Sequence, residues 1–223
     1  SGAVFGVQDD RLTSGPLAEV DRRVALVERT GAKVSRLDVL WSLVAPTRPA
    51  DPADPGDPAY DWARADAAMR GFARIGATPI LVAYSAPAWA AGGRGTPPGT
   101  EVNPNAPDPA AYGRFMAALA RRYSGSYRPP GATGPLPRAR HFEIWNEPNL
   151  GAFLSPQVRG GARVGAARYV AMLRAAYPAV HRANRGAIVI AGVGGPRSST
   201  GATGTGALEW ARRIAGSGAP FDA

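Results

Sequence analysis

The fold of this chain is decided by the stretch His141-Phe142-Glu143-Ile144-Trp145-Asn146-Glu147-Pro148-Asn149-Leu150. Apolar and polar positions alternate at its start, which is the period of a strand with one buried face. The stretch then ends in Asn-Glu-Pro-Asn, a polar run that packing does not require. Because Pro148 disfavours helical geometry in the residue before it, we predict that Glu147 continues the strand direction on a rigid stem. Asn146 offers one acceptor and two donors, which suits a ligand hydroxyl group.

Strand-like and helix-like segments alternate on both sides of this stretch. We expect further strands at 3–8, 34–44, 78–84 and 187–193, and helices between 16 and 31 and at 60–75, 109–123, 165–184 and 207–216. Pro178 should kink or split the helix that contains it, because it lacks a backbone N–H. Long connections are expected at 46–58, 85–108 and 195–206.

Five strand-then-helix units in series predict an α/β fold with a parallel sheet. Two architectures remain, an open doubly wound sheet and a barrel. Most turns from helix to strand are short and begin alike, at Gly31-Ala32, Gly76-Ala77, Gly186-Ala187 and Gly218-Ala219, whereas most strand-to-helix loops are long. Long loops at the carboxyl ends of the strands favour a TIM (β/α)8 barrel.

The length bears on how much of such a barrel is present. A (β/α)8 barrel usually takes about 250 residues, so 223 residues reach about five units and the opening of a sixth at 218–223. We therefore expect a single catalytic-type domain, 1–223, that is the amino-terminal part of a TIM barrel without strands six to eight. Its two open sheet edges should lead to self-association or be covered by further chain.

Composition argues against several other classes of protein. Lys and Arg number 26 against 17 Asp and Glu, which gives +9, but the basic residues are scattered and only Lys33 is a lysine. We expect no nucleic-acid partner and, without an apolar run of about 18 residues, no membrane partner. With no Cys and two His we expect neither a metal site nor a cofactor. The compartment is not determined; a secreted or cell-surface bacterial protein is compatible with the sequence.

The nine residues Phe142 to Leu150 resemble the retaining glycoside hydrolases of the clan with (β/α)8 barrels, whose fourth strand ends in Asn-Glu-Pro. The longer match resembles most the β-xylosidase and α-L-iduronidase family, family 39. The resemblance implies that Glu147 is the general acid/base and that Asn146 contacts the sugar 2-hydroxyl group. It also implies that Arg36, in Ser35-Arg36-Leu37-Asp38, supports the nucleophile. In that family the nucleophile is a second Glu on strand seven, and no position here corresponds to it.

The acidic and basic candidates also have structural interpretations. Retaining hydrolysis needs two carboxyl groups about 5–5.5 Å apart, and Glu143 lies roughly 13 Å along a strand from Glu147, so it is expected to be a paired structural acid. Arg36 would form an internal salt bridge to Glu143 or Asp38, and this role is compatible with support of a nucleophile.

Several other residues have two interpretations each. Trp41, Trp89 and Trp145 are candidate platforms for sugar rings, with core packing as the alternative. Asp9 and Asp10 are expected at the mouth of the first strand, and Asp10 has helix capping as its alternative. His141 is expected to be structural.

The sequence therefore predicts a retaining glycosidase with a carbohydrate substrate, inactive as residues 1–223 alone because the nucleophile is not contained. One alternative is a non-catalytic glycan-binding or scaffold protein with a barrel-derived fold. The other is a different barrel enzyme, such as a lyase or aldolase, although a single lysine disfavours Schiff-base chemistry.

Overall fold

The computed structural model describes residues 3–92, 106–191 and 193–223. Its elements in chain order are β1 (Gly6–Gln8), α1 (Arg11–Ser14), α2 (Val20–Arg29), β2 (Val34–Leu40), α3 (Trp41–Val44), α4 (Ala63–Ile75), β3 (Thr78–Tyr84), α5 (Pro109–Arg122), β4 (His141–Ile144), β5 (Val158–Arg159), β6 (Ala162–Arg163), α6 (Val164–Ala183), β7 (Ile188–Ile190) and α7 (Ala207–Ala215). Short 3-10 helices occupy Leu17–Glu19 and Ala88–Ala90.

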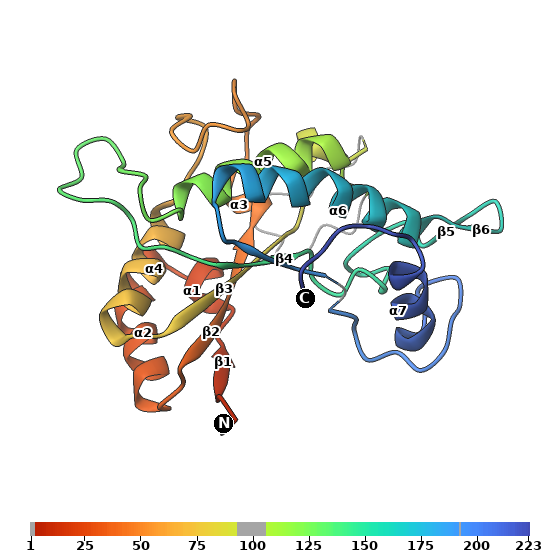
Figure 1. Ribbon diagram of the computed structural model, residues 1–223, viewed down its shortest axis with the longest axis horizontal. Helices are drawn as coiled ribbons and strands as arrows, with labels where there is room; N and C mark the ends of the chain where they lie inside the picture. The colour runs from red at the N-terminus through yellow and green to blue at the C-terminus, as the bar shows by residue number, and fades with distance from the viewer. Residues whose placement is uncertain (1–2, 93–105, 192) are drawn as a thin grey trace.

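Five of these strands form one parallel sheet in the order β1-β2-β3-β4-β7, so each strand pairs with the next strand of the main series (Figure 1). The chain then returns through α7 and reaches the outer side of β7. There Asp222 N donates to Val189 O at 2.9 Å, and Ala191 N donates to Ala223 O at 2.8 Å. Residues 222–223 thus occupy a sixth strand position, as the repeated Gly218-Ala219 turn predicts.

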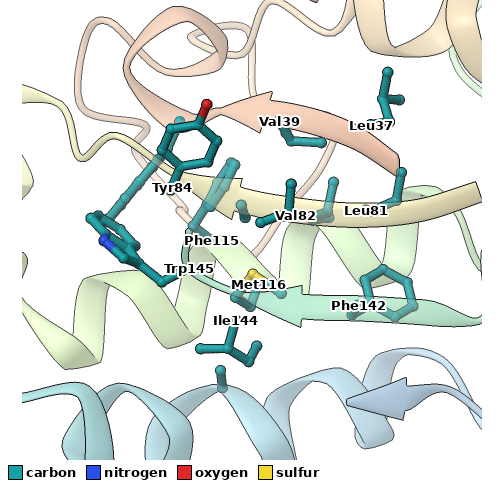
Figure 2. Packing of buried hydrophobic residues seen from close by; sticks show 14 of the residues in the cluster. Leu37, Val39, Leu81, Val82, Tyr84, Phe115, Met116, Phe142, Ile144 and Trp145 are labelled. Atoms are coloured by element: carbon teal, nitrogen blue, oxygen red, sulfur yellow. The ribbon is translucent and has the colours of Figure 1, made fainter. Parts of the chain in front are cut away.

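The two faces of the sheet differ in chemistry. Leu37, Leu81 and Phe142 are fully buried on one face, where α5 packs with side chains that include Phe115 (Figure 2). Because successive residues of a strand point to opposite faces, Arg36 and its neighbours lie on the other, polar face. A doubly wound sheet would carry helices and apolar residues on both faces. The fold is therefore α/β with a parallel sheet of the TIM-barrel type, of which about five β/α units are present.

The predicted Gly-Ala turns are confirmed as a repeated structural device. Gly31, Gly76, Gly186 and Gly218 have φ of +73°, +67°, +76° and +63°, the left-handed region that glycine enters without a steric penalty. The alanine after each glycine is buried. Each pair therefore reverses the chain at the end of a helix and inserts a small apolar side chain where the next strand begins.

Some predicted boundaries are wrong. The second strand ends at Leu40, and residues 41–44 form the helical turn α3 instead. Pro178 does not split its helix: α6 runs through it from Val164 to Ala183, and the alternative of a kink there stays a prediction. A residue with a backbone N–H at position 178 would have donated to the carbonyl oxygen of Arg174. Arg174 is exposed, so water can donate to this oxygen instead. Close packing of Gly113 against Ala175 also holds α6 to α5 just before the proline.

Three further differences concern loops. The antiparallel pair β5–β6 within the loop between β4 and α6 was not predicted. The last strand of the series, β7, is shorter than the expected 187–193, and position 192 lies outside the described residues. Most of the expected loop 85–108 lies outside them as well, since 93–105 are not described.

Candidate active site

Two tyrosine hydroxyl groups end the strand that carries the Asn-Glu-Pro motif. The Tyr112 hydroxyl donates to Ala83 O at 2.7 Å and accepts from Trp145 N at 3.2 Å. The Tyr169 hydroxyl donates to Ile144 O at 2.9 Å. These bonds replace the ladder at the carboxyl end of β4, so the backbone leaves the sheet without burying an unsatisfied polar group. The turn into the motif is thereby fixed from α5 and α6.

The backbone of the motif is not extended, which corrects the prediction for Glu147. Trp145 and Glu147 have φ of +65° and +39°, both in the left-handed region. Such a conformation costs a non-glycine residue roughly 1–3 kcal/mol, so surrounding contacts must hold it. A turn bond from Leu150 N to Glu147 O at 2.9 Å is one of them. This turn and the burial of Trp145 outweigh the preference that Pro148 imposes.

The side chain of Glu147 lies beside the loop that follows β7. A Cβ added to Gly195 would come within 3.0 Å of the Glu147 carboxyl carbon, so the two residues are in contact. Glu147 is partly exposed, and its carboxylate has no hydrogen bond or ion pair among the residues that the structure describes. The carboxylate is therefore held at the carboxyl end of β4 with its oxygens available to a ligand.

Arg36 joins three strands on the polar face. Its Nε and Nη2 donate to the two Glu143 oxygens at 2.8 and 2.5 Å, a bidentate ion pair. Nη2 also donates to Asn146 Oδ1 at 2.9 Å, and Nη1 donates to Gln8 Oε1 at 2.7 Å. Burial alone would lower the pKa of Arg36, but the hydrogen bonds and the charge of Glu143 outweigh it and raise the pKa. The internal salt bridges predicted for Arg36 are confirmed, and Glu143 is the paired structural acid that was expected.

The contact with Arg36 also orients Asn146. Because a guanidinium group can only donate, Asn146 must turn its amide oxygen towards Arg36. Its NH2 group makes no hydrogen bond within the described part of the chain and points away from that contact. Asn146 is therefore prepared to donate to a ligand acceptor beside Glu147.

Asp38 is a buried acid on the same face that the sequence indicated only as a salt-bridge partner. It accepts hydrogen bonds from the Tyr84 hydroxyl at 3.0 Å and from Gln8 Nε2 at 3.2 Å, and it lies 3.5 Å from Arg36 Nη1. Burial raises the pKa of Asp38 to about 6, although Arg36 and Tyr84 act in the opposite direction. Burial and the charge of Asp38 raise the pKa of Tyr84 in turn.

This raised pKa predicts a pH-dependent stability. Between pH 3.8 and about 6, folded Asp38 holds a proton that the unfolded chain releases, so its contribution to stability falls as the pH rises through this range. Asp38→Asn removes that dependence. We expect the free energy of unfolding of the wild type, relative to Asp38→Asn, to decrease by on the order of 3 kcal/mol from pH 4 to pH 7. Urea unfolding at several pH values measures it, and parallel curves for the two proteins would contradict it.

The structure corrects two of the three predicted sugar platforms. Trp41 is fully buried and stacks on Phe115 with ring centroids 5.1 Å apart. Trp145 is also fully buried, and its Nε1 donates to Phe153 O at 2.8 Å. Neither ring has a face to offer, because α3 and the left-handed turn direct both rings into the core. Trp89 is partly exposed and packs edge-on against Trp41, so it remains a candidate wall.

The structure also places the acids expected at the mouth of the first strand, Asp9 and Asp10, and the histidine expected to be structural, His141. Asp9 forms an ion pair with Arg23 at 2.9 Å. Asp10 precedes α1 but makes no side-chain cap; instead it accepts from Gln8 Nε2 at 2.7 Å, which ties it to the polar face. His141 is partly buried at the other end of β4, where desolvation lowers its pKa.

Two features of the described residues concern other kinds of site. No helix among 3–92, 106–191 and 193–223 is long and apolar enough to cross a membrane. Within the same ranges, no three His, Cys, Asp or Glu side chains are grouped so that they could hold a metal ion.

Several solved structures similar to this chain are glycoside hydrolases. A glucosidase from Croceicoccus marinus matches with a TM-score of 0.63 and 19% identity over 98% of this chain and 42% of its own. A family 1 β-glucosidase from Thermotoga maritima matches with a TM-score of 0.52 and 13% identity over 78% of this chain and 37% of its own. A family 39 glycoside hydrolase from Bacteroides cellulosilyticus WH2 has a TM-score of 0.48, 20% identity and coverages of 84% and 31%, too distant to support an argument.

These likenesses concern the fold. The chain spans about two fifths of the length of the Croceicoccus marinus glucosidase. No protein-family model and no curated protein matches the sequence.

Proposed function

We propose that this chain supplies the acid/base half of a retaining glycoside hydrolase, with Glu147 as the general acid/base. The observation that carries the proposal is the arrangement at the end of β4. There Arg36 holds the amide oxygen of Asn146 at 2.9 Å, while the adjacent Glu147 carboxylate is unpaired among the described residues. One polar group of this pair is thus oriented by the protein, while the Glu147 carboxylate and the Asn146 NH2 group are left for a ligand or solvent.

The proposed chemistry divides between this chain and a second carboxylate. Glu147 donates its proton to the glycosidic oxygen as the bond to the anomeric carbon breaks, and a nucleophilic carboxylate forms the glycosyl-enzyme ester. Glu147 then takes a proton from the water that cleaves this ester. The NH2 group of Asn146 donates to the sugar 2-hydroxyl oxygen. Glu143 is not the nucleophile in this scheme, because both of its oxygens bind Arg36.

Two further residues have proposed roles. Arg36 reaches Asn146 from β2 with its side chain 19% exposed, and we propose that it also supports the nucleophile. Trp89 is proposed as a wall for a sugar ring. The substrate is a carbohydrate, and the scheme requires neither metal nor cofactor. The glycosidases that share this fold support the reaction class, and the Asn-Glu-Pro-Asn run supports a relationship to family 39.

A binding experiment on purified residues 1–223 tests the proposal. We expect calorimetry to detect saturable binding of a cationic iminosugar, a transition-state mimic whose ammonium group pairs with a carboxylate. Glu147→Gln should weaken this binding roughly tenfold or more, since a hydrogen bond to a charged group contributes about 1.5–3 kcal/mol. Glu28→Gln, an exposed glutamate on α2, is the matched control and should bind as the wild type does.

The same preparation should release negligible phenol from aryl glycosides, because the scheme needs a nucleophile that this chain is not expected to contain. Robust turnover would refute the division of roles. Equal affinity in wild type and Glu147→Gln would refute the acid/base assignment, and glycan binding that ignores Glu147 would favour a non-catalytic binding protein.

A further inference from the structure

We propose that Asn149 is a positioning residue for Glu147. By fastening the loop after β7 to the Asn-Glu-Pro-Asn run, it places the Gly195 backbone against the Glu147 carboxyl group. The inference rests on the proposed function, and it assigns a role to a motif residue for which the sequence offered none.

The contacts of Asn149 are directed to that loop. Its Oδ1 accepts from Gly195 N at 2.7 Å, and its Nδ2 donates to Gly195 O at 3.1 Å and to Thr205 O at 2.9 Å. Its backbone oxygen accepts from Thr205 N at 2.8 Å. The side chain is fully buried, so no water competes for these bonds. One amide thus holds both polar groups of the Gly195 residue, in the way a paired strand would.

Gly195 lies where a larger residue would not fit. A Cβ there would come within 2.5 Å of Leu150 Cδ1 and 3.0 Å of the Glu147 carboxyl carbon. The bare backbone at this position therefore forms one wall of the Glu147 side chain. Moving the loop would move this wall.

Glu147 needs such a wall because its own backbone is strained. Its φ of +39° is unfavourable for a residue with a side chain, so contacts from other elements must hold it. Arg36 fixes the neighbouring Asn146 from β2. Asn149 fixes Gly195 from the opposite side, that of β7 and α7. Glu147 lies between these two supports, and each support is itself held in place by hydrogen bonds.

The test compares two buried asparagines. Asn184 is the matched control: it is 2% exposed, donates to Tyr123 O and Ala139 O at 3.3 and 3.0 Å, and accepts from Arg138 at 3.3 Å. It precedes β7 and so lies at the opposite end of the sheet from Glu147. Asn149→Ala and Asn184→Ala each remove three side-chain hydrogen bonds of a buried asparagine and should destabilise the chain alike.

The first readout is spectroscopic and needs no activity. In residues 1–223 we expect nuclear Overhauser effects between the Glu147 side chain and the Gly195 α protons. These should disappear in Asn149→Ala and persist in Asn184→Ala. If Asn149→Ala does not fold, Asn149→Asp serves instead, because it keeps the size of the side chain while removing the hydrogen bonds that Asn149 Nδ2 donates to Gly195 O and Thr205 O. Persistence of the effects between the Glu147 side chain and the Gly195 α protons in the variant used would overturn the inference.

The second readout is kinetic, on a form of the protein that turns over aryl glycosides. Asn149→Ala should lower kcat/KM for poor leaving groups by about 10–10²-fold, the cost of a carboxyl group displaced by about 1 Å. Asn184→Ala should leave it unchanged within about twofold. If Glu147→Gln impairs poor leaving groups selectively but Asn149→Ala does not, the positioning role alone fails. If Glu147→Gln shows no selectivity, the proposed function fails.

Discussion

Glu147→Gln is expected to lower kcat/KM for glycosides with poor leaving groups by about 10²–10⁴-fold, the usual contribution of a general acid. Activated aryl glycosides should lose far less in the glycosylation step. An alkoxide leaving group needs a proton as the glycosidic bond breaks, whereas a nitrophenolate departs without one. The carboxamide keeps the shape of Glu147 and some hydrogen bonding but cannot release a proton.

The measurement is a series of aryl and alkyl glycosides assayed on a form of the protein that turns them over. The slope of log kcat/KM against leaving-group pKa should become steeper in the variant. A small anion such as azide should restore turnover of activated substrates, because it attacks the glycosyl-enzyme ester without help from a base. Glu28→Gln is the control and should match the wild type. Equal losses on good and poor leaving groups would remove Glu147 from the acid role.

The sequence predicted the fold where local chemistry controls it. Gly31 and Gly76, for example, end helices in a conformation that glycine tolerates best, and a small apolar residue follows each of them into a strand. A barrel and a doubly wound sheet differ in what covers the face that carries Arg36 and Glu143. The period-two alternation of the sequence does not by itself show what covers a face. The all-parallel sheet with a polar face resolves that choice.

The candidate site was predictable only in part. Asn146 and Glu147 stand out because they follow a strand directly, and Arg36 follows from the family resemblance. Tyr112 and Asn149 gave no comparable signal, because their hydroxyl and amide groups act on residues 29 and 46 positions away in the chain. Because side chains two apart on a strand share a face, the sequence could have predicted that Asp38 lies on the same face of β2 as Arg36.

The tryptophans show why residue type alone misleads. Trp41 and Trp145 have the flat rings that sugars pack against, yet both are fully buried. Their direction is set by backbone geometry at the strand ends: α3 begins at Trp41, and Trp145 has φ of +65°. Continuing the alternation of β4 by one residue would place Trp145 on the polar face with Glu143, the side opposite to the one where its ring lies. Continuing the alternation of β2 places Trp41 on the buried face with Leu37, so the burial of Trp41 agrees with the strand pattern.

Arg36→Met is expected to destabilise residues 1–223 by about 3–5 kcal/mol at pH 7, because it leaves buried carboxylates without their counter-ion. Glu143 and Asp38 are each 3% exposed, and Arg36 is their shared partner at 2.5 and 3.5 Å. Methionine replaces the aliphatic part of the arginine, so little packing is lost. Urea unfolding at 25 °C measures the change in the free energy of unfolding.

Two further variants decide what the effect means. Arg74→Met breaks an ion pair with Asp21 at 3.1 Å in which both side chains are largely exposed, and it should cost less than about 1 kcal/mol. Arg36→Met combined with Glu143→Leu should recover much of the loss, since no unpaired charge remains at position 143. If Arg36→Met costs no more than Arg74→Met, water reaches the polar face freely, and that face is not the interior of a barrel. In that case Arg36 does not hold Asn146 in place for a substrate, and the support proposed for Glu147 from the side of β2 is lost with it.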